Sequence, residues 1–141
     1  MAPKKKIVPV SAEDSARLSA IVEMHLELLA FGPMSPFGKE FVRAVGYELP
    51  MRDGSMRLVC MEIDGDIAGF IAFADDARHF YASALKGHFV KTSWLTLRSL
   101  LSKPSRVLAL LRAMRFARER SSGEDIPAGT AEITAIAVRP D

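Results

Sequence analysis

Few residues in this sequence combine a reactive side chain with a spacing that chemistry requires. Cys60 lies within an apolar stretch where no basic residue is placed to activate its thiol, so we expect a core residue. His79 and His88 have no Cys, Asp or Glu at ligand spacing, and the sequence therefore predicts no metal site. His25 falls on the apolar side of a helical pattern, where a single histidine is more often a hydrogen-bonded core or cleft residue than a catalyst.

Glu132 is the carboxylate whose position most invites a chemical role. It begins an apolar segment with the two-residue period of a strand. From the pattern alone it is a solvated carboxylate at the mouth of that strand. Strict alternation would place on its face Thr134, Ile136 and Val138, and on the other Ile133, Ala135 and Ala137.

The composition is that of one globular domain. Of the 141 residues, 49% are apolar and 26% are charged, enough to close a hydrophobic core. The single cysteine and the lack of a secretory leader favour a cytoplasmic location. No uncharged stretch approaches the roughly 20 residues that a spanning helix needs, so we expect no integral membrane segment.

The N-terminal half predicts one strand and two helices. Residues 7–10 form the strand, and Pro9 favours an edge position. Residues 11–14 fit a capping box that starts a helix, whose apolar stripe continues until residues 31–33 stop it. Ser35 and Pro36 start a second helix that ends near residues 49–50.

The centre of the chain predicts a β-hairpin. Residues 56–63 and 67–74 flank Asp64-Gly65-Asp66, which suits a tight turn. The second strand is apolar on both faces, which predicts a central strand covered on each side. Residues 131–138 form the last strand.

Residues 78–120 have a helical pattern with a strong charge bias. They hold ten Lys or Arg against one acid, Glu119, a balance of +9, so the rest of the chain must sum to 2 − 9 = −7. A break at residues 102–105 predicts two helices. In the second helix, the side expected to face a core holds Val107, Leu108, Leu111 and Met114, with Phe116 a further candidate. The side expected to face away holds Arg106, Arg112, Arg115 and Arg118.

Three interpretations of this basic segment stay open. It is a solvated outer face, a site for an anionic small molecule, or a surface for nucleic acid or a membrane. Because it has no interleaved platform of aromatic and basic residues, nucleic acid is not the partner we expect.

The order of these elements over the whole chain resembles the first half of the GNAT N-acyltransferase superfamily. Two segments carry the resemblance, the hairpin from Leu58 to Phe70 (LVCMEIDGDIAGF) and the closing ITAIAVRP at residues 133–140. On the last strand that family lays the pantetheine arm of acyl-CoA. The resemblance implies one domain over residues 1–141 with an α/β (α+β) fold, a mixed, mostly antiparallel sheet flanked by helices, and residues 78–120 as a helical insert.

The resemblance also implies an activity. It is acetyl transfer from acetyl-CoA, the cosubstrate, to an amine on a small molecule or peptide, by direct attack without a covalent enzyme intermediate. Glu132 would take the amine proton, and the backbone of Ile136, Ala137 and Val138 would contact the acyl-CoA arm. The side chains implied at an apolar substrate entrance are Phe31, Met34 and Phe37, for which simple packing is the alternative.

The sequence departs from the family at one place. The family's last strand leads into a glycine-rich loop that binds the CoA pyrophosphate, and residues 1–141 contain no match to that loop. The resemblance therefore implies a fold incomplete at its C-terminus, in which this chain alone supplies half of the acetyl-CoA site. The alternative is a non-catalytic remnant or binding module that uses an exposed sheet edge, including as a homodimer through the last strand.

Overall fold

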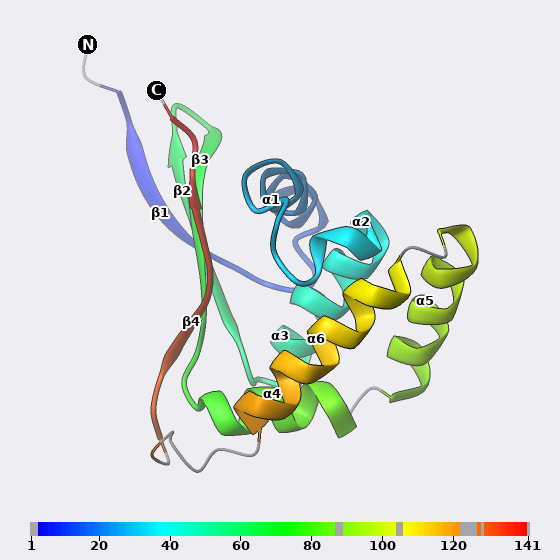
Figure 1. Cartoon of the computed structure of the whole chain (residues 1–141). Helices are drawn as coiled ribbons and strands as arrows, with labels where there is room; N and C mark the ends of the chain where they lie inside the picture. Colours follow the sequence, from blue (N-terminus) through cyan, green and yellow to red (C-terminus); the bar gives the residue numbers. More distant parts are fainter. Residues whose placement is uncertain (1–2, 87–88, 104–105, 122–126, 128, 141) are drawn as a thin grey trace.

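Four strands form one antiparallel sheet in a computed structural model that describes residues 3–86, 89–103, 106–121, 127 and 129–140. The sheet has the order β1-β2-β3-β4. Its strands are β1 (Lys5–Val10), β2 (Arg57–Ile63), β3 (Asp66–Ala74) and β4 (Glu132–Val138). Figure 1 shows this sheet nearly edge-on with the described helices on one side, and both ends of the chain lie at one end of the sheet. The mixed α/β class expected from the sequence is confirmed.

The edge strand predicted near the N-terminus and the hairpin predicted at the centre of the chain are also confirmed. β1 is an edge strand, and Pro9 lies opposite Val59 of β2, where its missing N–H costs no interior ladder bond. Asp64 and Gly65 take φ values of 53° and 98°, as a tight hairpin connection between β2 and β3 requires. The Asp64 carboxylate accepts a bond from the Lys4 N–H at 2.9 Å, which ties the start of the chain to this turn.

β3 is central, but only one of its faces is covered by helices. The hydrophobic core lies between the sheet and α1 (Ser15–Leu28), and on that side β3 buries Phe70 and Ala72. On the opposite side Ile71 and Phe73 are half-buried, and no helix of the described residues covers them (Figure 1). The expectation of cover on each side was wrong because an apolar pattern does not show what packs against it.

The first helix begins later than the capping box predicts. Asp14, not Ser11, is the N-cap of α1, and its side chain accepts from the Arg17 N–H at 3.2 Å. The Arg17 guanidinium binds Asp14 and also Glu62 of β2, each at 2.6 Å. Arg17 therefore fixes both the start of α1 and the position of the helix on the sheet.

The second helical region starts at the expected residue but is irregular. A 3-10 turn, η1 (Ser35–Phe37), is followed by α2 (Lys39–Phe41), the π-helix η2 (Val42–Glu48) and α3 (Leu49–Arg52). The Ser35 hydroxyl donates to the carbonyl of Leu29 at 2.7 Å, so it satisfies the end of α1 and does not cap its own turn. Pro50 lies in the first turn of α3, where it is tolerated, and the helix does not stop there.

Residues expected to form two helices form three: α4 (Ala77–Lys86), α5 (Phe89–Ser102) and α6 (Arg106–Ser121). The core-facing side predicted for α6 was wrong, because the side chains predicted to be buried are 47–58% exposed: Val107, Leu108, Leu111 and Met114. The side chain of Phe116 lies outside the described residues.

Candidate functional site

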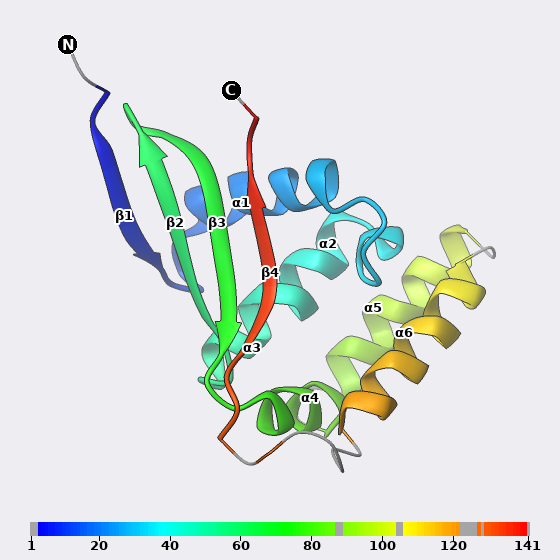
Figure 2. The same ribbon diagram turned by 60° about the vertical axis from the view of Figure 1, so that its left-hand side comes forward.

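A cavity of about 440 Å³ opens between the end of α1, the loop that follows it, and β4. In Figure 2 α1 crosses behind the sheet and its C-terminal end reaches the β4 edge. The walls of the cavity are formed by His25 and Leu28 of α1, by Leu29 and residues 31–34 of the loop, and by residues 133–136 of β4. The cavity therefore brings together Phe31, Met34 and Ile136 from the sequence prediction.

His25 is the one titratable side chain among the residues that line this cavity. Its ring is buried, and Nδ1 lies 2.6 Å from the hydroxyl of Tyr47. No described residue bonds to Nε2, and the described part of the structure contains no buried side-chain nitrogen or oxygen without a partner. Nε2 is therefore the ring nitrogen without a hydrogen-bond partner among the described residues, on a side chain that lines the cavity.

The hydrogen bond to Tyr47 determines the tautomer of His25. Tyr47 is fully buried, and His25 Nδ1 is the only acceptor for its O–H among the described residues. The O–H therefore donates to Nδ1, and the neutral imidazole carries its proton on Nε2. Burial lowers the pKa of His25, which favours this neutral form, and burial raises the pKa of Tyr47, which keeps its hydroxyl protonated. His25, which lines the cavity, thus carries a fixed N–H donor at Nε2.

The π-helix η2 positions Tyr47. The Leu49 N–H donates to the Ala44 carbonyl, five residues earlier, which is the hydrogen-bond pattern of a π-helix. π-Helices are rare in proteins, and those that occur are often found at functional sites. Arg43 of η2 holds this segment against α1, because its guanidinium donates to Ser19 at 2.8 Å and to Ser15 at 2.9 Å, both on α1. The His25–Tyr47 pair therefore joins two elements that are fixed to each other.

A β-bulge at Thr134 reshapes the β4 wall of the cavity. Ala135 pairs with Ala72 and Ile133 pairs with Phe73, so Thr134 is the extra residue. Its hydroxyl lies 3.8 Å from the sulfur of Met56, which places it on the helix side of the sheet. The predicted alternation was therefore wrong beyond Thr134: the helix side holds Ala135 and Ala137, and the open side holds Ile136 and Val138.

The three residues of β4 assigned to the acyl-CoA arm do not all direct their peptide groups to the same edge of the strand. The Arg139 N–H donates to the Ala68 carbonyl of β3 at 2.8 Å, and peptide groups alternate between the partner strand and the other edge. The peptide groups of Ile136 and Val138 therefore face the free edge, whereas those of Ala137 face β3. Two of the three backbone contacts remain geometrically open.

Of the other site residues predicted from the sequence, some line the cavity and some do not. Glu132 is half-buried, opposite Ala74, and lies one residue outside the stretch of β4 that lines the cavity. Phe31 is exposed and Met34 is half-buried at the cavity. Phe37 is buried against Phe41, with ring centroids 4.7 Å apart, and does not line it. Packing is therefore the role that the contacts of Phe37 support.

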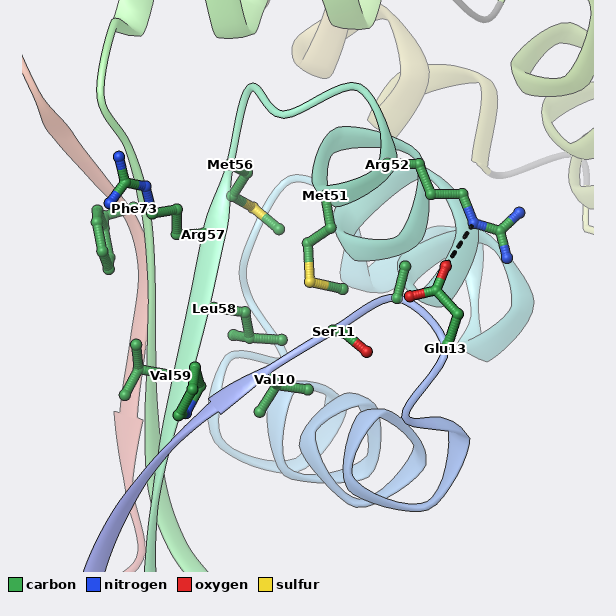
Figure 3. Close-up of a pocket in the computed structure, with 12 residues that line it drawn as sticks. Val10, Ser11, Glu13, Met51, Arg52, Met56, Arg57, Leu58, Val59 and Phe73 are labelled. Carbon is green, nitrogen blue, oxygen red and sulfur yellow. Dashed lines mark ion pairs between the residues drawn. The ribbon is translucent and has the colours of Figure 1, made fainter.

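A second cavity, of about 630 Å³, lies at the opposite edge of the sheet (Figure 3). Val10, Met51, Met56 and Leu58 point into the space between α3 and the strands. Among its charged groups, Glu13 and Arg52 are exposed and face each other at 3.9 Å. None of its lining residues is a buried titratable group, in contrast to His25 in the first cavity.

Comparison with known proteins identifies no relative of this chain. No family model matches the sequence, and neither a curated protein nor a solved structure matches the chain. No helix in the described ranges combines the length and apolar character needed to cross a bilayer. The described residues also contain no group of three or more His, Cys, Asp and Glu that is arranged to hold a metal ion.

Proposed function

We propose that this protein is an acetyl-CoA-dependent N-acyltransferase of the GNAT type. The observation that carries the proposal is that three features meet at one edge of the sheet. These are the outward-facing peptide groups of Ile136 and Val138, the bulge at Thr134, and the cavity with the His25 donor. β-bulges occur preferentially beside active sites, where they re-aim side chains.

The free edge of β4 suits the arm of an acyl thioester. A pantetheine arm carries amide donors and acceptors, and an extended chain with such groups binds a sheet edge as an added strand does. The neighbouring cavity is mostly apolar, with Leu28, Leu29 and Met34 in its wall, and so suits the thioester end of the arm.

The residues then take distinct roles. The His25 Nε2–H donates to the acyl carbonyl oxygen, which gains negative charge as the amine attacks, and a fixed donor in an apolar site stabilises that charge. Glu132 accepts the amine proton directly or through water. The tetrahedral intermediate then collapses, the bond between the acyl carbon and the sulfur breaks, and CoA leaves as its thiolate, which regains the proton taken up by Glu132. Phe31 and Met34 border the entrance for the amine substrate.

Acetyl transfer itself is the test. The protein is incubated with acetyl-CoA and a panel of primary amines, and acetylated products are detected by mass spectrometry. A high acetyl-CoA concentration is used because residues 1–141 contain no match to the pyrophosphate loop.

Glu132→Gln should lower the rate about a hundredfold and change the pH–rate profile. Glu119→Gln on α6 is the matched control and should leave the rate unchanged. Absence of product from every amine would contradict the proposal.

A binding module is the second candidate, and the exposed side chains of β4 favour it. Ile133, Ile136 and Val138 are 54–59% exposed and uncharged, beside peptide groups that face the free edge. Such a strand pairs readily with another strand. In this function β4 binds a second copy of the chain or an extended segment of a partner, and no acyl transfer takes place.

A further inference from the structure

The helices α5 and α6 expose large apolar side chains that no other described element covers. On α5, Trp94 is 65% exposed and Leu101 is 78% exposed. The spacing of Trp94, Leu97 and Leu101 places them along one side of the helix. On α6 the exposed apolar side chains are Val107, Leu108, Leu111 and Met114. We call these seven residues the apolar patch.

The two helices that carry the apolar patch also carry exposed positive charge. Arg98 on α5 and Arg112, Arg115 and Arg118 on α6 are exposed. The only acid in the sequence of these two helices is Glu119, which binds Arg115 at 2.9 Å. Arg98 lies 3.5 Å from Glu40 of α2, and both of these side chains are exposed, so that pair is weak. The patch is therefore set in a field of net positive charge.

We propose that α5 and α6 bind the surface of an anionic lipid bilayer. Helices that combine basic residues with exposed Trp and Leu lie in the plane of the interface, where the apolar side chains enter the headgroup boundary. Arginine suits this position because its stem packs among apolar groups while its guanidinium reaches the lipid phosphates. The inference rests on the helical pair alone and is independent of the proposed acyl transfer.

Charge and composition favour a bilayer over other occupants. A nucleic acid offers phosphates but little apolar surface for seven exposed side chains, and single strands are bound through stacked aromatic rings, of which the patch has one. A second copy of this chain would bring the same arginines against one another. An anionic bilayer matches both the apolar side chains and the charge.

Trp94 is the only tryptophan in the sequence, so it reports directly on binding. The full chain is titrated with phosphatidylcholine vesicles, with and without phosphatidylglycerol. We expect a blue shift of Trp94 emission and protection from acrylamide with the anionic vesicles only. Added salt should weaken the binding.

Two sets of variants separate the apolar and electrostatic contributions. Leu108→Ser with Leu111→Ser removes apolar area, and Arg112→Glu with Arg115→Glu reverses charge. Each pair should lower partitioning of the protein onto anionic vesicles at least tenfold. For the arginine pair the reason is that one basic residue near an anionic surface changes this partitioning about fivefold. The matched controls are on β1, where Ile7 is 74% exposed and Lys5 is exposed. Ile7→Ser and Lys5→Glu should bind as the unchanged chain does. Circular dichroism checks that all variants fold.

Several results would overturn the proposal. Equal binding to neutral and anionic vesicles, or equal loss in the β1 controls, would show that the helical pair does not recognise the bilayer. Tight binding of a single-stranded oligonucleotide without vesicle binding would assign the arginines to nucleic acid. A dimer that Leu108→Ser with Leu111→Ser dissociates would show that a second copy covers the patch.

Discussion

At the scale of single residues, the His25–Tyr47 hydrogen bond is the feature on which the site depends most. Because Nδ1 is occupied by the Tyr47 hydroxyl, Nε2 keeps its proton and remains a hydrogen-bond donor. The sequence predicted a hydrogen-bonded core or cleft residue rather than a catalyst; the contacts confirm the hydrogen bond and the burial, and the catalytic role that we propose departs from that prediction. Tyr47 was not predicted, because a seven-residue π-helix shifts the side of η2 that faces the core and leaves no signal in a 3.6-residue pattern.

Tyr47→Phe should destabilise the fold. The substitution keeps the ring but removes the O–H, so the buried Nδ1 of His25 loses its donor. Leaving one buried group unsatisfied costs about 1–3 kcal/mol in the free energy of unfolding, which urea denaturation measures. Phe41→Leu, a change elsewhere in the same helical region, serves as a comparison for packing loss alone. An unchanged free energy of unfolding in Tyr47→Phe would mean that the bond contributes nothing.

The stability of the protein should also carry a pH dependence from His25. Burial lowers the pKa of His25 from its ordinary value of 6.5, so the unfolded chain binds the proton more tightly than the folded chain does. The free energy of unfolding therefore keeps this contribution in full above a pH of about 6.5. Below that pH the free energy of unfolding falls until the folded-state pKa is reached. His25→Gln should lose this part of the slope in urea denaturation. Parallel curves for the two proteins would contradict the assignment.

At the scale of elements, regular strands were predictable and the irregularities that build the site were not. The hairpin of β2 and β3 follows from apolar runs around Asp64 and Gly65, and it was confirmed. The bulge at Thr134 was missed because alternation assumes an uninterrupted ladder. The exposed side of α6 was assigned to the core because a helical period shows that apolar residues share a face, not what that face meets.

The close approach of β3 and β4 requires Gly69. A Cβ at this position would lie 3.0 Å from the Ala137 carbonyl oxygen and 3.4 Å from the Val138 Cα, and both are backbone atoms that move only with the strand. Gly69→Ala should therefore lower the free energy of unfolding by about 1–3 kcal/mol and speed hydrogen exchange at the Arg139 amide. Ala68→Ser, at the neighbouring half-buried position, is the control. Retained exchange protection would show that the strands adjust without cost.

At the scale of the whole molecule, the four-stranded sheet ends on β4, a strand whose outer edge no described residue covers. We therefore expect self-association through this edge at tens of micromolar or above, measured by size-exclusion chromatography with light scattering. Ile136→Lys should shift the protein toward monomer, because it adds charge to an exposed edge position while its backbone stays in place. Ile7→Lys on β1 is the matched control. A monomer in both the unchanged chain and Ile136→Lys would contradict edge pairing.

The central claim is that an acyl thioester binds along β4 with its carbonyl at His25, and an NMR titration tests it most directly. Acetyl-pantetheine is the probe, because it carries the arm and the thioester without the nucleotide. The account predicts shifts of the Ile136 and Val138 amides and of the His25 Nε2–H, with the Ala137 amide, which faces β3, changing least. Shifts confined to residues around Met51 and Met56 in the other cavity, or no shifts on β4, would contradict the account.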